Sequence, residues 1–510
     1  MGFAELTQSV FLDDALSHWA IHAPHAEALR SGERAISYET LNKMADRFAG
    51  FLLSQDVQIG DRVAICSAKS AAAIAALYGA LRIGAIYVPI NPLAPEGRMR
   101  SALNKTEPSC IFADDLRLKR LEDLGASYFI AGLSEVLQLE CDRAPQTLRQ
   151  SQRAPTDGAY ILLTSGTTGE PKGILHTHQS GMAYAKAAAD ICALSSIDRV
   201  SHHTPLHFDM SIFDIFSTAQ AAACAVLIPE SHTKFPASLS KMMEEERITV
   251  WYSVPFALTQ LATRGALVER DLSALRVVMF AGEQMPPSTI SAFAAHASKA
   301  VFLNAYGPTE TNHCTTARFT HDMLDGVTAL PIGFPNDGVI TRIGATEVHE
   351  EEGELLVAGD QIMQSYWQDD PTSSERMVVL PDSMGIPRQF YRTGDIVRLD
   401  DTGAFVLIGR QDRQVKVRGY RVELDEIELA LTNTPQVKEA AVMISEDVIC
   451  AFVATHPGCE VDSVTDYISD ILPAYAIPEN ILHVPHLART STGKVDRKAL
   501  LEALRCGHAA

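Results

Sequence analysis

A loop rich in glycine and hydroxyl side chains gives the clearest chemical signal in this sequence. The apolar run at residues 160–163 leads directly into residues 164–172, which hold four hydroxyl side chains, two glycines and one lysine. Consecutive backbone N–H groups in such a loop form an anion-binding nest, and the hydroxyls and the lysine add donors. It is not a Walker A loop, because no Gly-Lys-Ser/Thr follows the first glycine at the required spacing. The pattern favours a polyphosphate-binding loop over a plain surface turn.

Further polar motifs follow this loop along the chain. Residues 304–310 place an aromatic ring, a turn and an acid after an apolar run. Tyr306 is suited to stack on a base, Thr309 to donate to a phosphate oxygen, and Glu310 to hold a hard cation such as Mg²⁺. Asp395 ends another motif and is suited to bind two vicinal ribose hydroxyls. Each motif alone also has an ordinary structural explanation, such as a solvated acid after a strand.

The bulk composition narrows the class of protein. The formal charge of −20 argues against a nucleic-acid-binding protein, which needs a concentrated basic face. No apolar run reaches the roughly 18 residues that cross a bilayer, and the first residues lack the pattern of a signal peptide. The nine cysteines are scattered without metal-binding spacing. We therefore expect a cytoplasmic protein with neither a membrane nor a nucleic-acid partner.

The order of apolar segments indicates the fold class. Over the first 400 residues, strand-like runs alternate with helical stretches, which is typical of layered α/β structure. Buried strands are predicted at residues 63–66, 85–89, 225–229, 250–254 and 277–280, and helices at residues 71–81 and 182–189. Shorter strands with frequent turns at residues 353–405 predict a small β subdomain. From residue 412, strands at 440–444 and 449–454 and helices at 423–431 and 464–472 predict a small α+β domain.

Taken in this order, the motifs resemble the adenylate-forming superfamily, and specifically the amino-acid adenylation domains of nonribosomal peptide synthesis. The resemblance spans nearly the whole chain, because residues 36–41, 81–90, 352–359 and 472–478 match the family's structural motifs. It implies a large α/β adenylation core at residues 1–411, which binds ATP and an amino acid. It also implies a mobile C-terminal lid at residues 412–510, which carries the catalytic lysine.

The resemblance implies a ligase that uses ATP and Mg²⁺ in two steps. The substrate carboxylate first attacks the α-phosphorus of ATP, which gives an acyl-adenylate and pyrophosphate. A thiol then attacks the adenylate and expels AMP. Both steps depend on charge neutralisation and in-line positioning more than on acid–base groups. Between them the lid rotates about a hinge at Asp412, withdraws Lys494 and presents the loop at residues 416–419.

The resemblance also assigns roles by motif position. By this assignment the phosphates are bound by Thr164, Ser165, Gly166, Thr167, Thr168, Gly169 and Lys172. The rest of the nucleotide is bound by Ala281, Gly282, Glu283, Asn304, Ala305, Tyr306, Gly307, Thr309, Asp395 and Arg410. Lys494 bridges the substrate carboxylate and the α-phosphate, so the expected catalytic residues are Lys494, Lys172 and Thr309. Glu310 is the expected metal ligand.

Asp209 carries the argument about the substrate. Amino-acid-activating members keep an aspartate at this position for the substrate ammonium, and a buried carboxylate without such a partner is costly. A turn or capping role is the alternative for Asp209. The other pocket positions carried over from the family are Met210, Phe213, Tyr252, Met279, Ala281, Ala305, His313 and Cys314. Because most are apolar and several are bulky, we expect a small, largely neutral amino acid.

The pocket looks like that of the stand-alone prolyl-adenylating enzymes, with departures. Tyr252, Ala281 and Cys314 agree with that pocket. Met210, Phe213 and Met279 replace smaller aliphatic residues, Ala305 replaces a larger one, and His313 replaces an aliphatic residue. His313 either bonds a polar group on a modified substrate or points away and bonds the backbone. The substrate is therefore expected to be proline-like or alanine-like.

Several alternatives stay open. Nothing follows Ala510 in this sequence, so we expect the thiol to come from the phosphopantetheine arm of a free-standing carrier protein. Rival hypotheses are a D-alanine–carrier-protein ligase, an acyl- or aryl-CoA ligase of the same fold, and a catalytically silent binding module. Asp425 stands where the family usually has glycine, and if the position demands a positive φ, aspartate tolerates it better than most residues.

Overall fold

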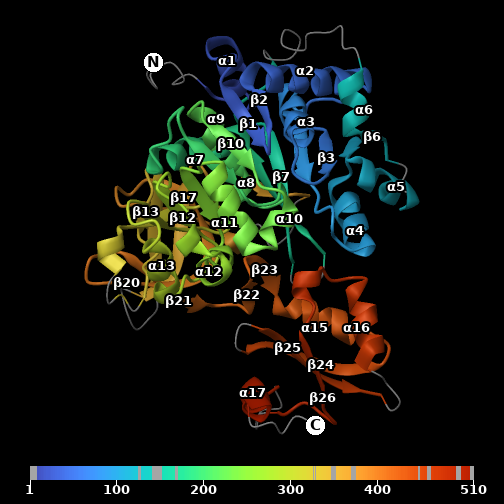
Figure 1. Ribbon diagram of the computed structural model, residues 1–510. Helices are drawn as coiled ribbons and strands as arrows, with labels where there is room; N and C mark the ends of the chain where they lie inside the picture. The colour runs from blue at the N-terminus through green and yellow to red at the C-terminus, as the bar shows by residue number, and fades with distance from the viewer. Residues whose placement is uncertain are drawn as a thin grey trace. The chain divides into compact units, whose positions relative to one another are not determined.

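The computed structural model describes residues 9–124, 128–139, 152–166, 170–324, 327, 329–345, 352–368, 375–445, 448–456, 461–489 and 495–505. The chain divides into two compact units (Figure 1). The first consists of Met1–Pro92, Thr106–Leu162 and Gly173–Gln411, and the second of Leu93–Lys105, Leu163–Lys172 and Asp412–Ala510. The predicted α/β class is confirmed, with a large N-terminal part and a small C-terminal part.

A nine-stranded sheet forms one layer of the first unit. Its order is β15 (Phe334–Pro335), β14 (Thr315–Phe319), β13 (Val301–Tyr306), β12 (Val277–Phe280), β11 (Val250–Ser253), β9 (Arg199–His202), β10 (Cys224–Leu227), β1 (Glu27–Ser31) and β2 (Arg34–Ser37). The strands from β13 to β1 in this order run parallel, and the edge strands are antiparallel. The carboxyl ends of the parallel strands therefore meet at one edge, where α/β proteins place their ligands.

A second, seven-stranded sheet contains the strand that leads into the phosphate loop. Its order is β18 (Ser365–Tyr366), β8 (Lys172–Thr177), β7 (Gly158–Thr164), β4 (Ile86–Pro89), β3 (Arg62–Cys66), β5 (Cys110–Ala113) and β6 (Ile130–Gly132). Strands β3, β4 and β5 are buried at almost every position. Their continuous apolar runs are those expected of parallel strands covered on both faces.

The turn-rich region forms the expected β subdomain. Its antiparallel sheet has the order β16 (Val339–Ala345), β17 (Glu352–Gly359), β20 (Pro387–Leu399) and β19 (Met377–Pro381), and β21 (Phe405–Arg410) also pairs with β20. The long strand β20 carries Asp395 directly opposite Arg410 of β21. This register brings together two residues that the sequence separates by a turn.

The helices of the first unit cover these sheets (Figure 1). They are α1 (Asp14–His22), α2 (Tyr38–Ser54), α3 (Ala71–Arg82), α5 (Asp115–Asp123), α6 (Leu133–Gln138), α7 (His178–Ile191), α8 (Met210–Ile212), η4 (Phe213–Ser217), α9 (Thr218–Gln220), α10 (Glu230–Thr233), α11 (Pro236–Glu245), α12 (Pro255–Arg264), η5 (Leu267–Glu269), α13 (Pro287–Ala294) and η6 (His321–Leu324). Ser70 caps α3 by accepting from the Ala73 N–H at 3.1 Å, and Thr177 caps α7 through Ser180. Among the described residues, no helix is both long enough and apolar enough to span a bilayer.

The second unit contains a hairpin and a small sheet with helices. The hairpin is β22 (Gln414–Val417) with β23 (Tyr420–Glu423), and the sheet is β24 (Val437–Ser445), β25 (Val448–Thr455) and β26 (Asn480–His483). The helices are α4 (Glu96–Thr106, whose last residue belongs to the first unit), α15 (Leu424–Thr432), α16 (Val461–Ser469), η7 (Ala474–Ala476) and α17 (Arg497–Arg505). Arg418 and Gly419 have φ of 53° and 85°, which makes the tight two-residue turn of the hairpin.

The position of Asp425 does not demand a positive φ. Asp425 lies in the first turn of α15, where an acidic side chain is favoured by the helix dipole. Its carboxylate pairs with Arg413, which also bonds Glu428 at 2.8 Å. The aspartate therefore adds an ion pair next to Asp412 and needs no unusual backbone.

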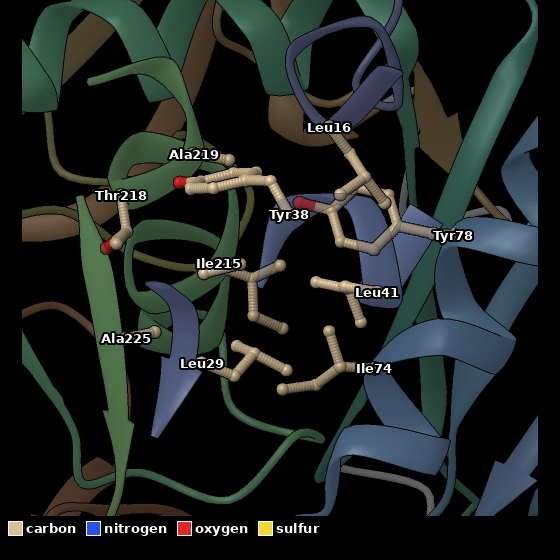
Figure 2. Close-up of a pocket in the computed structure, with 11 residues that line it drawn as sticks. Leu16, Leu29, Tyr38, Leu41, Ile74, Tyr78, Ile215, Thr218, Ala219 and Ala225 are labelled. Carbon is tan, nitrogen blue, oxygen red and sulfur yellow. The ribbon is translucent and has the colours of Figure 1, made fainter. Parts of the chain in front are cut away.

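A small cavity lies inside the first unit (Figure 2). Its volume is about 10 Å³, and its lining includes Leu29, Leu41, Ile74, Tyr78 and Ile215. None of the residues around it belongs to the predicted site. An apolar space of this size holds at most one water molecule, so it is a gap in core packing and not a substrate pocket.

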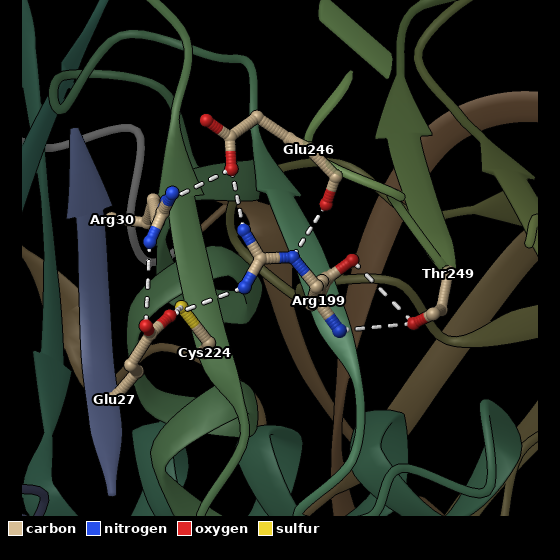
Figure 3. Close-up of polar contacts among 6 residues, drawn as sticks. All are labelled: Glu27, Arg30, Arg199, Cys224, Glu246 and Thr249. Carbon is tan, nitrogen blue, oxygen red and sulfur yellow. Dashed lines mark hydrogen bonds and ion pairs between the residues drawn. The ribbon is translucent and has the colours of Figure 1, made fainter. Parts of the chain in front are cut away.

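A network of charges joins the amino-terminal ends of the parallel strands (Figure 3). Arg199 bonds Glu27 at 3.1 Å and the Glu246 carboxylate at 2.5 Å, and Arg30 bonds the same two acids. The Arg199 N–H donates to the Thr249 hydroxyl at 3.0 Å. Because these groups stand where β1, β9 and β11 begin, the network braces the sheet at the edge opposite the carboxyl ends.

We expect Arg199→Ala to lower the free energy of unfolding by about 1–3 kcal/mol, because Glu27 and Glu246 lose a shared cation. Thermal unfolding of the purified protein measures this change. The matched control is Lys241→Ala, which removes an exposed i,i+4 pair with Glu245 and is expected to leave the melting temperature unchanged. Equal shifts for the two variants would contradict a bracing role for Arg199.

Candidate functional site

The predicted phosphate loop joins two neighbouring strands. β7 ends at Thr164 and β8 begins at Lys172. A Cβ on Gly166 would lie 2.4 Å from the Glu170 carbonyl oxygen, so only glycine fits this tight turn. The hydroxyl oxygen of Thr164 is buried and has no hydrogen-bond partner among the described residues. Thr167, Thr168 and Gly169 lie outside the described residues. The described part of the loop is thus compact and offers one buried donor, which suits an anion.

The loop between β13 and β14 carries the second motif. A Cβ on Gly307 would lie only 1.8 Å from the Asn312 carbonyl oxygen, so the chain doubles back closely at this glycine. The Gln361 amide donates to the carbonyls of Thr311 at 2.6 Å and His313 at 3.0 Å, and the Asn336 amide also donates to that of His313. Gln361 and Asn336 were not predicted. They satisfy the loop's buried carbonyls and fix its shape.

Asp209 and Thr309 meet across 100 residues of sequence. The Thr309 hydroxyl donates to the Asp209 carboxylate at 2.6 Å. Asp209 precedes α8, but its side chain does not cap that helix. The helix continues into the wide π-turn η4, a feature that often marks functional sites. The capping interpretation of Asp209 therefore fails, and its carboxylate is held by a site residue instead.

The predicted pocket residues are buried. Phe213 packs edge-on against Tyr252, with ring centroids 5.3 Å apart. Burial raises the pKa of Tyr184 and Tyr252 well above the ordinary value, and the charge of Asp209 adds to both shifts. These shifts place both phenols near Asp209. The remaining apolar positions are also buried, namely Met210, Met279, Ala281, Ala305 and Cys314.

His313 lies on the same loop as Thr309 and packs against Tyr184. The Tyr184 hydroxyl and His313 Nδ1 are 3.3 Å apart, and the two rings meet edge to face. Burial lowers the pKa of His313 to about 3, so the imidazole is neutral near pH 7. Because its hydrogen-bond partner is Tyr184, the His313 side chain does not bond the backbone, which was one of the two expected arrangements. Tyr184 was missed because no motif contains it.

Glu310 is fully buried and is held from two sides. The Tyr366 hydroxyl donates to Glu310 Oε1 at 2.9 Å, and Glu310 contributes a charge that acts on His176. His176 Nε2 lies 3.0 Å from the Thr309 carbonyl oxygen. Burial lowers the pKa of His176 to about 4, so this ring is a neutral support. Tyr366 lies on the two-residue strand β18, which carries no recognised motif, and His176 lies on β8 beyond the phosphate-loop motif.

Tyr306, Asp395 and Arg410 form one cluster. The Tyr306 hydroxyl donates to Asp395 Oδ2 at 2.5 Å, and Arg410 pairs with Oδ1 at 2.6 Å. The Asn304 amide donates to the Pro331 carbonyl at 2.8 Å. Three residues assigned to the nucleotide thus meet, while Asn304 is bound to backbone. The loop of Ala281, Gly282 and Glu283 follows β12, at the same carboxyl edge of the sheet.

A buried polar network beside the pocket was also missed. Asp214 follows Phe213 in η4, is fully buried, and accepts from the Thr204 hydroxyl at 3.0 Å. Burial raises its pKa well above the ordinary value. Lys69 donates to the His202 carbonyl at 2.9 Å, and burial lowers its pKa to about 8, against the attraction of Asp214. These groups anchor the segment that carries Asp209 and Phe213.

The second unit contains the predicted phosphate loop at residues 164–172 as well as Asp412 and Lys494. Asp412 begins the long C-terminal part of that unit, and its carboxylate accepts from the Gln414 N–H at 3.4 Å. Lys494 lies outside the described residues.

The sequence of the chain matches a known family along most of its length. Residues 16–367 match the family described as AMP-binding enzyme, and residues 426–494 match the AMP-binding enzyme C-terminal domain. The chain therefore belongs to the AMP-binding enzymes, and the predicted resemblance to adenylate-forming ligases is confirmed.

Named relatives are similar over nearly their full length. The chain is 32% identical to an L-proline–[L-prolyl-carrier protein] ligase of Pseudomonas fluorescens, covering 96% of this chain and 98% of the relative. It is 31% identical to the ligase of the same name from Streptomyces coelicolor, covering 92% of each. The adenylation domain AlmE of Vibrio cholerae, solved with glycyl-adenosine-5'-phosphate, superposes with a TM-score of 0.83 at 26% identity, covering 98% of both chains.

We expect Gln361→Leu to loosen the loop that carries Thr309 and His313, because two buried carbonyls lose their donor. The free energy of unfolding should fall by about 1–3 kcal/mol. Hydrogen exchange of the amides at residues 311–314 measures the local effect, and thermal unfolding the global one. Unchanged protection at these amides would show that Gln361 does not hold the loop.

Proposed function

We propose that this enzyme activates a small, largely neutral amino acid as its aminoacyl-adenylate and transfers the aminoacyl group to the phosphopantetheine thiol of a carrier protein. The observation that carries the proposal is the Asp209 carboxylate, which is bonded to Thr309 at 2.6 Å and caps no helix. A carboxylate among buried apolar side chains favours a substrate ammonium as its counter-ion. Acyl and aryl acids have no such group.

The pocket supports a compact substrate. Met210, Phe213 and Met279 are buried and fill space that a large side chain would need. The relatives named for L-proline and the glycyl-adenylate structure are consistent with a small amino acid. Proline itself is one candidate, and the departures in the pocket favour a relative of it.

The nucleotide is assigned to residues at the carboxyl edge of the sheets. We infer that the phosphate loop binds the β- and γ-phosphates, with Lys172 as its cation. The cluster of Tyr306, Asp395 and Arg410 offers a carboxylate for the ribose hydroxyls. Tyr306 uses its hydroxyl on Asp395, which leaves the face of its ring for the base. In-line attack by the substrate carboxylate on the α-phosphorus then expels pyrophosphate.

Glu310 fits the role of a Mg²⁺ ligand on chemical grounds. Mg²⁺ bound to nucleotides takes one or two carboxylates, and phosphates and water supply its other ligands. Glu310 would supply one such carboxylate, which is buried in the first unit. When bound, the metal neutralises phosphate charge. Tyr366 holds Glu310 in place by its hydrogen bond.

We propose that residues 1–411 act as the core and residues 412–510 as the mobile lid. Lys494 serves the adenylation step by pairing with the substrate carboxylate and the α-phosphate. The hairpin turn at Arg418 and Gly419 serves the second step, in which the thiolate attacks the adenylate carbonyl and AMP departs. Arg413 is held by Glu428 at 2.8 Å, so the backbone beyond Asp412 is anchored and Asp412 suits a pivot. We assign the protein to the cytoplasm, where reduced thiols persist.

Two other functions are distinguished by their products. A D-alanine–carrier-protein ligase would prefer D-alanine in ATP–pyrophosphate exchange. An acyl- or aryl-CoA ligase would release a free acyl-CoA and would respond to an acid without an amino group. Exchange assays across L-proline and its analogues, both alanines, glycine, serine and several aryl acids separate these cases.

We expect Asp209→Asn to reduce amino-acid-dependent ATP–pyrophosphate exchange at least about 100-fold, because the substrate ammonium loses its counter-ion. Thermal unfolding should show a folded protein. The control Asp190→Asn changes an exposed acid of α7 and should leave exchange unchanged. A normal Michaelis constant in Asp209→Asn would refute the ammonium assignment.

We expect Lys494→Ala to abolish adenylation and to leave transfer from preformed aminoacyl-adenylate largely intact, because the lysine acts only in the first step. Pyrophosphate exchange measures the first half-reaction, and loading of the carrier protein measures the second. Lys498→Ala, a change at an exposed lysine of α17, is the control for adenylation. Equal loss of both half-reactions would overturn the assigned role.

A further inference from the structure

His313 has one ring nitrogen fixed and the other unused. Its Nδ1 lies 3.3 Å from the Tyr184 hydroxyl, and the ring stands at 83° to that of Tyr184, with centroids 4.8 Å apart. The residue is 5% exposed, and its Nε2 has no hydrogen-bond partner among the described residues. Buried polar atoms in native proteins are nearly always paired, so we expect this nitrogen to have a hydrogen-bonding partner that is not part of the described residues.

His313 is connected to the surroundings of Asp209 through its neighbours. His313 shares its loop with Thr309, which bonds Asp209. Burial raises the pKa of its partner Tyr184 and of Tyr252, and the charge of Asp209 adds to both shifts. Gln361 and Asn336 bind the backbone carbonyl of His313 and hold the loop backbone at this residue. The ring is therefore held among the residues that surround the ammonium anchor.

The surroundings make His313 a selective polar position. The other carried-over pocket positions supply buried apolar side chains, among them Met210, Met279 and Ala305. A pocket of this kind does not discriminate strongly by apolar contact alone, whereas a buried hydrogen-bonding group rejects substrates that leave it unpaired. The imidazole is neutral, since burial lowers its pKa to about 3. A neutral imidazole offers one N–H donor and one acceptor nitrogen.

A hydroxyl is the group that fits. The Tyr184 hydroxyl either donates to His313 Nδ1 or accepts from it, so Nε2 is correspondingly a donor or an acceptor. A hydroxyl group donates and accepts, and it satisfies both arrangements. We propose that His313 binds a hydroxyl on the substrate side chain, so that the enzyme selects a hydroxylated small amino acid over its unsubstituted analogue. This inference rests on the proposed amino-acid activation.

Matched pairs of substrates test the proposal on the unaltered enzyme. ATP–pyrophosphate exchange is measured for L-proline against its 3- and 4-hydroxy derivatives in both configurations, L-alanine against L-serine, and L-2-aminobutyrate against L-threonine. We expect a kcat/KM at least about tenfold higher for the hydroxylated member of the preferred pair. Equal or better activity with the unsubstituted member would overturn the proposal, and Nε2 would then be served by water.

Variants of His313 test whether this residue causes the preference. We expect His313→Leu to bring the ratio of the two kcat/KM values close to one, mainly by raising KM for the hydroxylated substrate. His313→Gln, which keeps a hydrogen-bonding group, should retain part of the preference. The control His178→Leu removes another buried histidine, whose Nδ1 accepts from the Leu12 N–H at 3.3 Å, and should leave the ratio unchanged. An unchanged ratio in His313→Leu would overturn the proposal.

The two levels of inference fail in different ways. If no amino acid of any pair supports exchange while an aryl or fatty acid does, the proposed function falls and the hydroxyl assignment falls with it. If an unsubstituted amino acid is the best substrate, amino-acid activation stands and only the role of His313 is overturned.

Discussion

The close approach of Gly307 to the Asn312 carbonyl is the constraint on which the site depends. Because the chain doubles back there, residues 309, 310 and 313 are brought onto one short loop and face different partners. Thr309 reaches Asp209, Glu310 reaches Tyr366, and His313 reaches Tyr184. Backbone hydrogen bonds within the loop and the amides of Gln361 and Asn336 hold its shape. Substrate and nucleotide residues are thus coupled through one piece of backbone.

The two ends of the parallel strands in the large sheet carry different kinds of polar cluster. At the amino-terminal edge, Arg199, Arg30 and two glutamates satisfy one another (Figure 3). At the carboxyl edge, Asp209 and the loop after β13 keep polar groups available. A network whose charges are all paired stabilises and does little else, whereas a polar group without a protein partner is costly unless a ligand pairs with it. The parallel strands separate these two kinds of polar cluster.

Much of the fold and the site could be read from the sequence. The predicted strands at residues 63–66, 250–254 and 277–280 coincide closely with β3, β11 and β12, because their apolar runs are short and bounded by turns. Motif residues such as Asp209 and Asp395 were found because their types and order are specific. Tyr184, Tyr366 and Gln361 were missed because each acts through a contact distant in sequence. The sequence left open whether Asp425 needs a positive φ, and the structure places it in the first turn of the helix α15.

The π-turn η4 limits how this pocket can change. A π-turn holds one residue more than an α-helical turn, and here it directs Phe213 toward Tyr252 while the neighbouring Asp214 reaches Thr204. Loss of one residue would restore α-helical geometry and rotate one end of the segment by about 100° relative to the other. Phe213 would then face the polar surroundings that Asp214 has now, and Asp214 would face the apolar surroundings of Phe213. Across related sequences, the chain length between Asp209 and Thr218 should therefore be constant while the side chains at positions 210 and 213 vary.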